Sequence, residues 1–262
     1  MKEMLINLLV GGSGILVVIG MYFFVATHGS LWVQRCWHCK YKDIYWLYKN
    51  PYLIWFTDRQ PLISTILLGK YFKMTSDIIK AINQQSVANK RILQIGCAFG
   101  QFSQKIAENC RAESVSVVDL IKSEIINSRS KIGMISAKSD FNFIVASGAP
   151  LPYKDETFNC VILFFLFHEL PIEEKAKVLK EASRVLKVGG EIVFAEFHRP
   201  FSRLLRVSGR CFFWVFEPYA KEMWNKFEPI KVLNQETPNK WRDKRITYLM
   251  GNYQVLRIKK IN

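Results

Sequence analysis

Short, almost wholly apolar runs alternate with amphipathic segments through residues 86–262, a pattern typical of buried parallel strands joined by helices. The runs that predict strands are 92–95, 115–118, 141–146, 160–167 and 191–197. The segments that predict helices are 73–83, 102–109, 122–131 and the stretch from Pro171 to the glycine pair at 189–190, which we expect to end that helix. Residues 245–250 and 254–258 predict a closing hairpin. This order indicates an α/β domain with a mostly parallel sheet.

The N-terminal part has a different pattern, because residues 4–26 carry no charge and are numerous enough to span a bilayer. A cleaved signal peptide is the alternative, but its apolar region would be shorter. Arg35, Lys40 and Lys42 follow this stretch, whereas only Lys2 and Glu3 precede it. We therefore expect a single transmembrane anchor over residues 1–30. The same bias predicts that the main domain faces the cytoplasmic side of a bacterial inner membrane or the matrix side of the mitochondrial inner membrane.

Residues 31–85 are unusually aromatic between positions 45 and 56. The aromatic and aliphatic residues recur at spacings of three and four, which predicts helices over an apolar cleft. One interpretation is a helical cap that packs on the sheet or on a membrane surface. The other is a lid that shapes a pocket for an apolar, planar substrate, with Arg59 as its polar contact. The two interpretations are compatible, and both stay open at this point.

The net charge of +15 indicates an anionic partner, either lipid headgroups or nucleic acid. Within residues 201–228, Arg203, Arg206 and Arg210 are interleaved with apolar residues and followed by the run Phe212-Phe-Trp-Val-Phe216. A nucleic-acid patch would not need these aromatic residues. The segment therefore predicts a basic amphipathic helix that lies on an anionic lipid membrane, and we expect no nucleic-acid partner.

A glycine turn, Gly96-Cys97-Ala98-Phe99-Gly100, joins the first predicted strand to the next helix. Glycine allows the backbone to turn sharply and to approach a ligand closely, although such a turn also occurs without a ligand. Asp119 follows the second predicted strand, at the position where a carboxylate holds the diol of a ribose. Together the turn and Asp119 predict a site for a nucleoside cofactor.

Titratable residues follow the fourth and fifth predicted strands: His168 and Glu169 after one, Glu196 and His198 at the other. Because ligands of open α/β sheets bind at the carboxyl ends of the strands, we expect these side chains near the reaction site. Imidazole and carboxylate groups suit manganese or a similar divalent ion, so His168, Glu169 and Glu196 are candidate metal ligands. Alternatively, Glu169 caps a helix, His198 turns the chain, and the cluster has only a structural role.

The turn, Asp119, Leu151-Pro-Tyr153 and the block Glu181-Ala-Ser-Arg-Val-Leu-Lys-Val-Gly-Gly190 resemble class I S-adenosylmethionine-dependent methyltransferases. This resemblance implies a Rossmann-like three-layer sandwich over residues 86–262 and S-adenosylmethionine as the cofactor. The expected cofactor-binding residues are Gln94, Gly96, Cys97, Gly100, Asp119 and Ser147. Three positions depart from the family pattern: Gln94 replaces an acidic residue, Ala98 a glycine, and Ser147 an aspartate.

More specific blocks resemble the RquA family of rhodoquinone biosynthesis, over about residues 43–258: Asp58-Arg-Gln60, Leu163-Phe-Phe-Leu-Phe-His-Glu169 and His198-Arg-Pro200 among them. This resemblance implies conversion of ubiquinone, a polyprenyl quinone, to rhodoquinone by replacement of a ring methoxy group with an amino group. It also implies that S-adenosylmethionine donates the amino group and that manganese assists. The expected catalytic residues are His168, Glu169, His198 and Arg59.

Two other functions stay open. One is a quinone or lipid C- or O-methyltransferase in which His168 or His198 is the general base. The other is a catalytically silent membrane adaptor that keeps the fold, because Gln94 and Ser147 depart from the family pattern.

Overall fold

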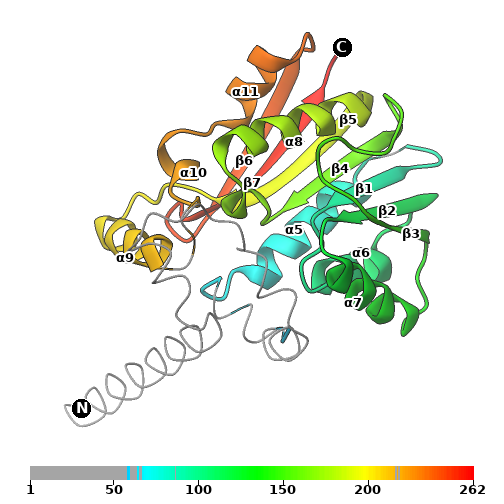
Figure 1. The fold of residues 1–262 in the computed structure, drawn as a ribbon, viewed down its shortest axis with the longest axis horizontal. Coiled ribbons are helices and arrows are strands. Elements are labelled where there is room, and N and C mark those ends of the chain that lie inside the picture. Colours follow the sequence, from blue (N-terminus) through cyan, green and yellow to red (C-terminus); the bar gives the residue numbers. More distant parts are fainter. Residues whose placement is uncertain (1–57, 60–63, 65–66, 86, 216, 218) are drawn as a thin grey trace.

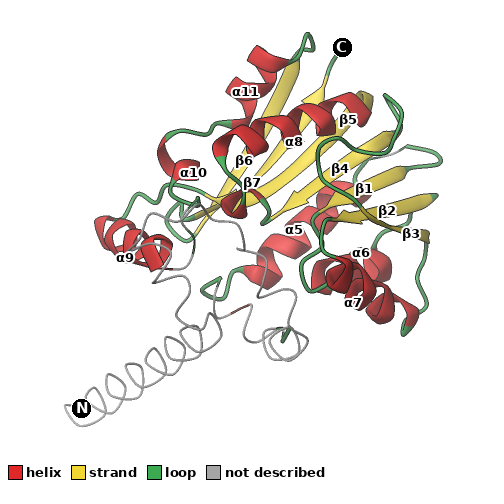
Figure 2. Cartoon of the chain, in the orientation of Figure 1, coloured by secondary structure: helices red, strands yellow, loops and turns green. Residues whose placement is uncertain are grey.

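A seven-stranded sheet with helices on both faces forms the body of the protein (Figures 1 and 2). The computed structural model describes residues 58, 59, 64, 67–85, 87–215, 217 and 219–262. The predicted anchor over residues 1–30 and most of the predicted lid over residues 31–85 lie outside these residues. In the described part of the chain, no helix has both the length and the apolar character needed to cross a membrane.

The strand order is β3-β2-β1-β4-β5-β7-β6. Strands β1 to β5 run parallel to one another, β7 is antiparallel to β5, and β6 is antiparallel to β7. Their bounds are β1 Arg91–Ile95, β2 Ser114–Asp119, β3 Asp140–Val145, β4 Phe158–Phe164, β5 Leu186–Phe197, β6 Trp241–Tyr248 and β7 Tyr253–Lys260. The order reverses between β1 and β4, and ligands of open α/β sheets bind at such a switch point.

Alternating apolar residues bury both faces of the sheet, as the near-continuous apolar strands predict. In β1, Ile92 belongs to the core under one set of helices, while Leu93 and Ile95 belong to the core on the other face. The first core takes in α5 Tyr71–Asn83, α6 Gln101–Asn109 and α7 Lys122–Gly133, and the second takes in α8 Ile172–Val185 and α11 Pro229–Glu236. Two more helices, α9 Arg203–Val215 and α10 Glu222–Asn225, connect β5 to α11. The three-layer α/β sandwich is therefore confirmed.

Several predicted boundaries shift by a few residues, among them the start of β6, and two that lie next to β4 are wrong for a clear physical reason. The fourth strand was predicted to reach residue 167, but β4 ends at Phe164 because Phe165 has a φ of +48°. A 3-10 helix, η2 Phe167–Glu169, follows. His168 therefore lies in this 3-10 helix, beyond the end of β4 at the carboxyl edge of the sheet.

The second wrong boundary is the end of α8, which the glycine pair does not set. Helix α8 ends at Val185, and residues 186–190 already belong to β5. The pairing with β4 jumps from Phe158–Leu186 to Cys160–Glu191, so that extra residues bulge out of β5. A Cβ atom on Gly190 would lie 2.8 Å from the carbonyl oxygen of Asn159. Glycine at this position allows β4 and β5 to approach one another, rather than ending a helix.

Candidate active site

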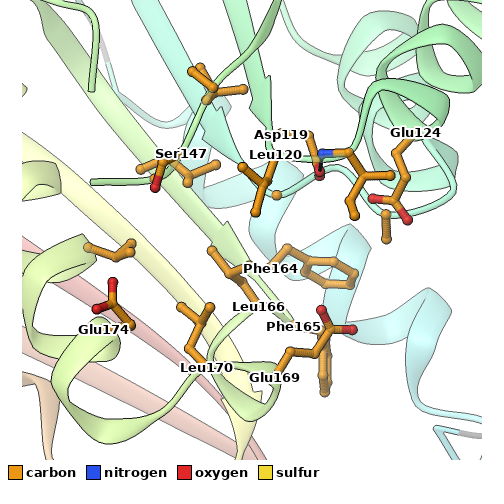
Figure 3. A pocket seen from close by; sticks show the side chains of 18 of the residues that line it. Asp119, Leu120, Glu124, Ser147, Phe164, Phe165, Leu166, Glu169, Leu170 and Glu174 are labelled. Atoms are coloured by element: carbon orange, nitrogen blue, oxygen red, sulfur yellow. Dashed lines mark hydrogen bonds between the residues drawn. The ribbon is translucent and has the colours of Figure 1, made fainter. Parts of the chain in front are cut away.

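A cavity of about 280 Å³ lies at the carboxyl ends of β1 and β2, beside the loops that follow β3 and β4 (Figure 3). Four carboxylic acids line it: Asp119, Glu124, Glu169 and Glu174. Among the described residues that line this cavity there is no lysine, arginine or histidine. The cavity therefore favours a ligand that carries positive charge and lacks phosphate groups.

Asp119 ends β2 and is held firmly by the backbone around it. Its Oδ2 atom accepts a hydrogen bond of 2.8 Å from the N–H of Cys97, and its Oδ1 atom accepts one of 2.9 Å from the N–H of Ile121. Gly96 lines the cavity at a φ of +78°, and its N–H donates to the carbonyl of Val118. These bonds join the predicted glycine turn to Asp119 and fix a carboxylate at the wall of the cavity.

Three residues expected to bind the cofactor do not line the cavity and support the turn instead. The Gln94 side chain donates to the carbonyl of Gly96 at 3.1 Å and accepts from the Ser103 hydroxyl at 2.8 Å. Cys97 is buried, and its N–H is bound to Asp119. Gly100 has a φ of +74°, and a Cβ atom there would lie 2.6 Å from the Cα of Ser128 in α7. Gly100 is thus required by the close packing of α6 on α7.

Ser147 lines the cavity, as expected, and its hydroxyl is engaged with Ala149 in the loop after β3. Glu124, in the first turn of α7, was not predicted to belong to the site. Burial raises the pKa of Glu124 from 4.5 to about 11, and the charges of Asp119 and Glu169 raise it further in the same direction. The sequence carries no signal for this residue, because an acid in the first turn of a helix is usually exposed and interacts with the helix dipole.

A second group of titratable residues surrounds His168 in η2. The Nδ1 atom of His168 lies 3.1 and 3.2 Å from the two carboxylate oxygens of Glu196, which is fully buried at the end of β5. Its Nε2 atom lies 3.9 Å from Glu169 and 4.0 Å from Glu217. The structure therefore brings together His168, Glu169 and Glu196 as expected, and adds Glu217 from the connection between α9 and α10.

Burial by itself lowers the pKa of His168, but the negative charges of Glu196, Glu217 and Glu169 outweigh it and raise the pKa from 6.5 to about 10. The imidazole is consequently positively charged at neutral pH. In this state His168 can donate a hydrogen bond or a proton, whereas the predicted general base requires the neutral form.

His198 and Arg59 do not line the cavity. The Nδ1 atom of His198 lies 2.8 Å from the carbonyl oxygen of Gly251, so it carries the proton and donates, and Nε2 faces Arg245 at 3.4 Å. This pairing fastens the β6–β7 turn to the end of β5. Arg59 is exposed. The predicted alternative in which His198 turns the chain agrees with these contacts.

Asp58, the neighbour of Arg59, connects the N-terminal segment to the glycine turn. It accepts hydrogen bonds from Gln101 at 2.8 Å and from Asn127 at 3.1 Å, and it forms an ion pair with Lys131. Asn127 and Lys131 also donate to the carbonyl of Phe99 within the turn. One set of polar side chains on α6 and α7 therefore holds both Asp58 and the turn.

Comparison with known proteins places this site in a family. A profile of the ubiE/COQ5 methyltransferase family matches residues 45–250. The ubiquinone/menaquinone biosynthesis C-methyltransferase UbiE of Haemophilus ducreyi is 30% identical over 112 residues, which make up 42% of this chain and 42% of that protein. The demethylmenaquinone methyltransferase of Shouchella clausii is 27% identical over 170 residues, 60% of this chain and 70% of that protein. The match thus spans less than half the length of the Haemophilus relative.

Solved structures are similar in fold. The N-methyltransferase NodS of Bradyrhizobium japonicum, in complex with S-adenosyl-L-homocysteine, has a TM-score of 0.52 at 15% identity and covers 72% of this chain and 87% of that chain. At this identity the likeness concerns the fold alone. The family profile, by contrast, covers strands β1 to β6, the cavity and the His168 group together. The chain belongs to the ubiE/COQ5 methyltransferase family.

Proposed function

We propose that the protein is an S-adenosylmethionine-dependent enzyme that modifies the ring of a polyprenyl quinone, with methyl transfer to a ring carbon as the first candidate reaction. The observation that carries this proposal is the cavity at the switch point, with four carboxylic acids and no basic residue among its described lining residues. A dinucleotide would bring phosphate charge into it, whereas S-adenosylmethionine brings a sulfonium and an ammonium group.

When bound, S-adenosylmethionine supplies an electrophilic methyl group on its sulfonium. Asp119 would bind the ribose, because its carboxylate is already fixed by two backbone N–H groups at the wall of the cavity. Glu169 and Glu174 line the opposite part of the cavity, where negative charge would stabilise the cationic end of the cofactor (Figure 3). These residues bind and orient, and none of them needs to exchange a proton.

A quinone substrate is supported by the names of the relatives and by aromatic residues around His168. The ring of Phe165 lines the cavity and meets the His168 ring edge to face, at 6.1 Å between centroids. Phe197 meets the other side of His168 at 5.3 Å. A planar ring that packs against Phe165 would therefore have a positively charged hydrogen-bond donor nearby.

Replacement of a ring methoxy group by an amino group, the reaction implied by the resemblance to the RquA family, is the second candidate. The raised pKa of His168 favours it, since a cationic donor can polarise a quinone carbonyl and make the ring electrophilic toward an amine. The neutral Gln94, whose amide is bound to the turn, also replaces a carboxylate that would bind the amino group of the cofactor.

Expression in a host that makes ubiquinone but no rhodoquinone separates the candidates. For methyl transfer, a strain of this host that accumulates quinone precursors without the ring methyl group should add a methyl group to them, because the ubiquinone ring itself has no free carbon. Mass spectrometry of the host lipids would show this addition, accompanied by S-adenosylhomocysteine. It would show an amino group in place of a methoxy group for the second reaction. Unchanged quinones, together with no binding of S-adenosylmethionine by the purified protein, would contradict both and support the silent adaptor.

We further propose that His168, Glu169 and Glu217 can hold a divalent metal ion such as manganese, which would displace the proton from Nε2 of His168 when it binds. A carboxylate oxygen of Glu169 lies 3.9 Å and one of Glu217 lies 4.0 Å from Nε2 of His168, so that either carboxylate could share an ion with the imidazole. Glu196 was expected to be a ligand, but its oxygens contact Nδ1 of His168 and the N–H groups of residues 168 and 197. It would orient the imidazole instead. A bound ion would polarise a quinone carbonyl.

Measurements of manganese binding to the purified protein test this site. Calorimetry gives the affinity, and the electron paramagnetic resonance signal of free Mn²⁺ provides a second measurement. Glu217→Gln should weaken the affinity at least about tenfold, because it replaces a charged ligand by a neutral one. Glu236→Gln removes a carboxylate that pairs with Lys180 on the surface, and should leave the affinity unchanged. Equal affinities in all three proteins would exclude the proposed site.

We also propose that α9 rests on an anionic membrane from which the quinone enters, in addition to the anchor expected over residues 1–30. Phe201, Leu204, Val207 and Met250 are exposed. The N–H of Phe201 donates to the carbonyl of Met250, which joins the start of α9 to the β6–β7 turn at one end of the sheet (Figure 1). Arg203 and Arg210 are exposed on α9 beside these apolar side chains. Apolar and basic side chains together are typical of helices at a lipid surface.

A chain that lacks residues 1–30 should still sediment with vesicles that contain anionic lipid, and salt should weaken this binding. The double variant Leu204→Glu, Val207→Glu should lose most of it. Val188→Glu, which places a charge at an equally exposed apolar position in the bulge of β5, serves as the control and should bind as before. Loss of binding in the control alone, or in neither variant, would speak against α9 as the lipid contact.

A further inference from the structure

Glu124 is a buried carboxylic acid that the proposed mechanism does not use. Its side chain lines the cavity five residues after Asp119 and is only 4% exposed. The Oε1 atom of Glu124 has no hydrogen-bond partner among the described residues. Figure 3 shows Glu124 on the same wall of the cavity as Asp119, with Glu174 on the opposite wall. An enclosed acceptor without a partner is unfavourable unless a ligand supplies the missing hydrogen bond.

Two other hydrogen-bonding side chains, Cys97 and Asp119, lie close to the Glu124 carboxyl group. The Sγ atom of Cys97 and one carboxylate oxygen each from Asp119 and Glu124 lie within 4.8 Å of one another. Burial, and then the charge of Asp119, raises the pKa of both Cys97 and Glu124, so that both keep their protons at neutral pH. A metal ion would need these groups deprotonated, whereas a hydroxyl group needs neighbouring donors and acceptors. The cluster therefore fits a hydroxylic ligand.

The charged groups around Glu124 favour its protonated, neutral form. Asp58 and Glu169 both raise the pKa of Glu124 further. Lys131 on α7 is paired with Asp58 and with the carbonyl of Phe99. Lys131 therefore interacts with the glycine turn and does not form an ion pair with Glu124.

We propose that Glu124 is a second ribose-binding residue, which takes one hydroxyl of the cofactor's vicinal diol while Asp119 takes the other. Each oxygen of Asp119 already accepts one backbone N–H, and the Asp119 carboxylate is also hydrogen-bonded to the side chains of Cys97 and Glu124, which leaves it limited capacity for two hydroxyls. A carboxylic acid can both donate and accept, as a hydroxyl requires. This inference rests on the proposed function in one respect, namely that the ligand carries a ribose.

The test compares the dissociation constants of three ligands: S-adenosylhomocysteine and its 2′-deoxy and 3′-deoxy analogues, measured by calorimetry. The wild-type protein should prefer the ribose compound about tenfold over each deoxy analogue, as for the loss of one hydrogen bond. Glu124→Leu keeps the side-chain volume but removes both polar atoms. It should bind S-adenosylhomocysteine about tenfold more weakly and should lose its preference against one of the two analogues.

Two further variants distinguish binding from a structural effect. Glu124→Gln keeps a donor and an acceptor, and should retain the preference against both analogues. Glu174→Gln removes a carboxylate from the opposite wall, and should change the affinities for all three ligands by one common factor. If Glu124→Leu also weakens all three ligands by one common factor, Glu124 does not contact the diol and the inference fails while the proposed cofactor stands. If the wild-type protein binds none of the ligands, the proposed function itself fails.

The protonation of Glu124 gives an independent readout in the ligand-free protein. The pKa of Glu124 is higher in the folded state than in the unfolded state, so Glu124 takes up a proton when the protein folds above pH 4.5. The stability contributed by Glu124 is complete below this pH and is lost as the pH rises toward about 11. Glu124→Gln does not titrate, so its Tm should exceed that of the wild type by an amount that grows between pH 5 and pH 9. A difference in Tm that is independent of pH would show that Glu124 is ionised in the folded protein, against the inference.

Discussion

Replacement of Asp119 by alanine should weaken the binding of S-adenosylmethionine by about 2 kcal/mol or more, which corresponds to roughly 30-fold in the dissociation constant. The carboxylate is 8% exposed, lines the cavity and is the one charged acceptor that the backbone of the glycine turn fixes in place. Its loss removes a charge-assisted contact to the ribose and also leaves the N–H groups of Cys97 and Ile121 without their acceptor. Calorimetry with S-adenosylhomocysteine measures the effect.

Asp119→Asn separates the two contributions. The amide keeps one oxygen for the turn but has no negative charge, so we expect an intermediate affinity and a Tm close to that of the wild type. An Asp119→Ala protein that folds and binds the cofactor as tightly as the wild type would show that the ribose is held elsewhere.

Glu196→Gln should lower the turnover number at least 100-fold and leave the affinity for S-adenosylhomocysteine within about twofold, as for the loss of a positioned acid–base group. Glu196 does not line the cofactor cavity, but it holds His168 through Nδ1 and through the backbone N–H of the same residue. An amide presents only one acceptor oxygen to these donors. It also removes a negative charge that raises the pKa of His168, so that the pKa should fall, because burial is then opposed only by Glu217 and Glu169.

The His168 ring resonances, followed by NMR through a pH titration, check the physical cause. In the wild type His168 should stay protonated to about pH 10, whereas in Glu196→Gln it should titrate at a much lower pH. Turnover that survives the substitution, or an unchanged titration, would remove His168 and Glu196 from the reaction and leave them as structural residues.

The sequence was sufficient to predict the sheet and Asp119, because both depend on local patterns. Apolar strands buried on two faces produce continuous apolar runs, and the spacing between Gly100 and Asp119 follows from one helix and one strand. The end of β4 was not predictable in this way, since Phe165, Leu166 and Phe167 continue the apolar run while the backbone turns at Phe165.

The parts of the site that could not be predicted depend on how helices pack. Glu124 is buried because α7 lies against α6 at Gly100, and the sequence of α7 alone does not show which side of the helix faces the turn. Glu217 belongs to a segment whose composition predicts a lipid-facing helix, and it reaches His168 only because the chain folds back after α9. Gln94 and Gly100 were predicted to bind the cofactor. The family pattern does not distinguish residues that contact the cofactor from residues that hold the glycine turn in place.

The contacts of Asp58 couple the affinity for the cofactor to the position of the chain at Asp58. The side chains that hold it, on α6 and α7, also hold the turn whose Cys97 N–H is bound to Asp119. A ligand that tightens the turn therefore also tightens the attachment of Asp58. By thermodynamic reciprocity, any second ligand that favours the bound position of Asp58 would increase the affinity for the cofactor by the same factor as the cofactor increases the affinity for that second ligand. The polar side chains around Asp58 would in this way couple a contact made outside the cavity to the loading of the cofactor.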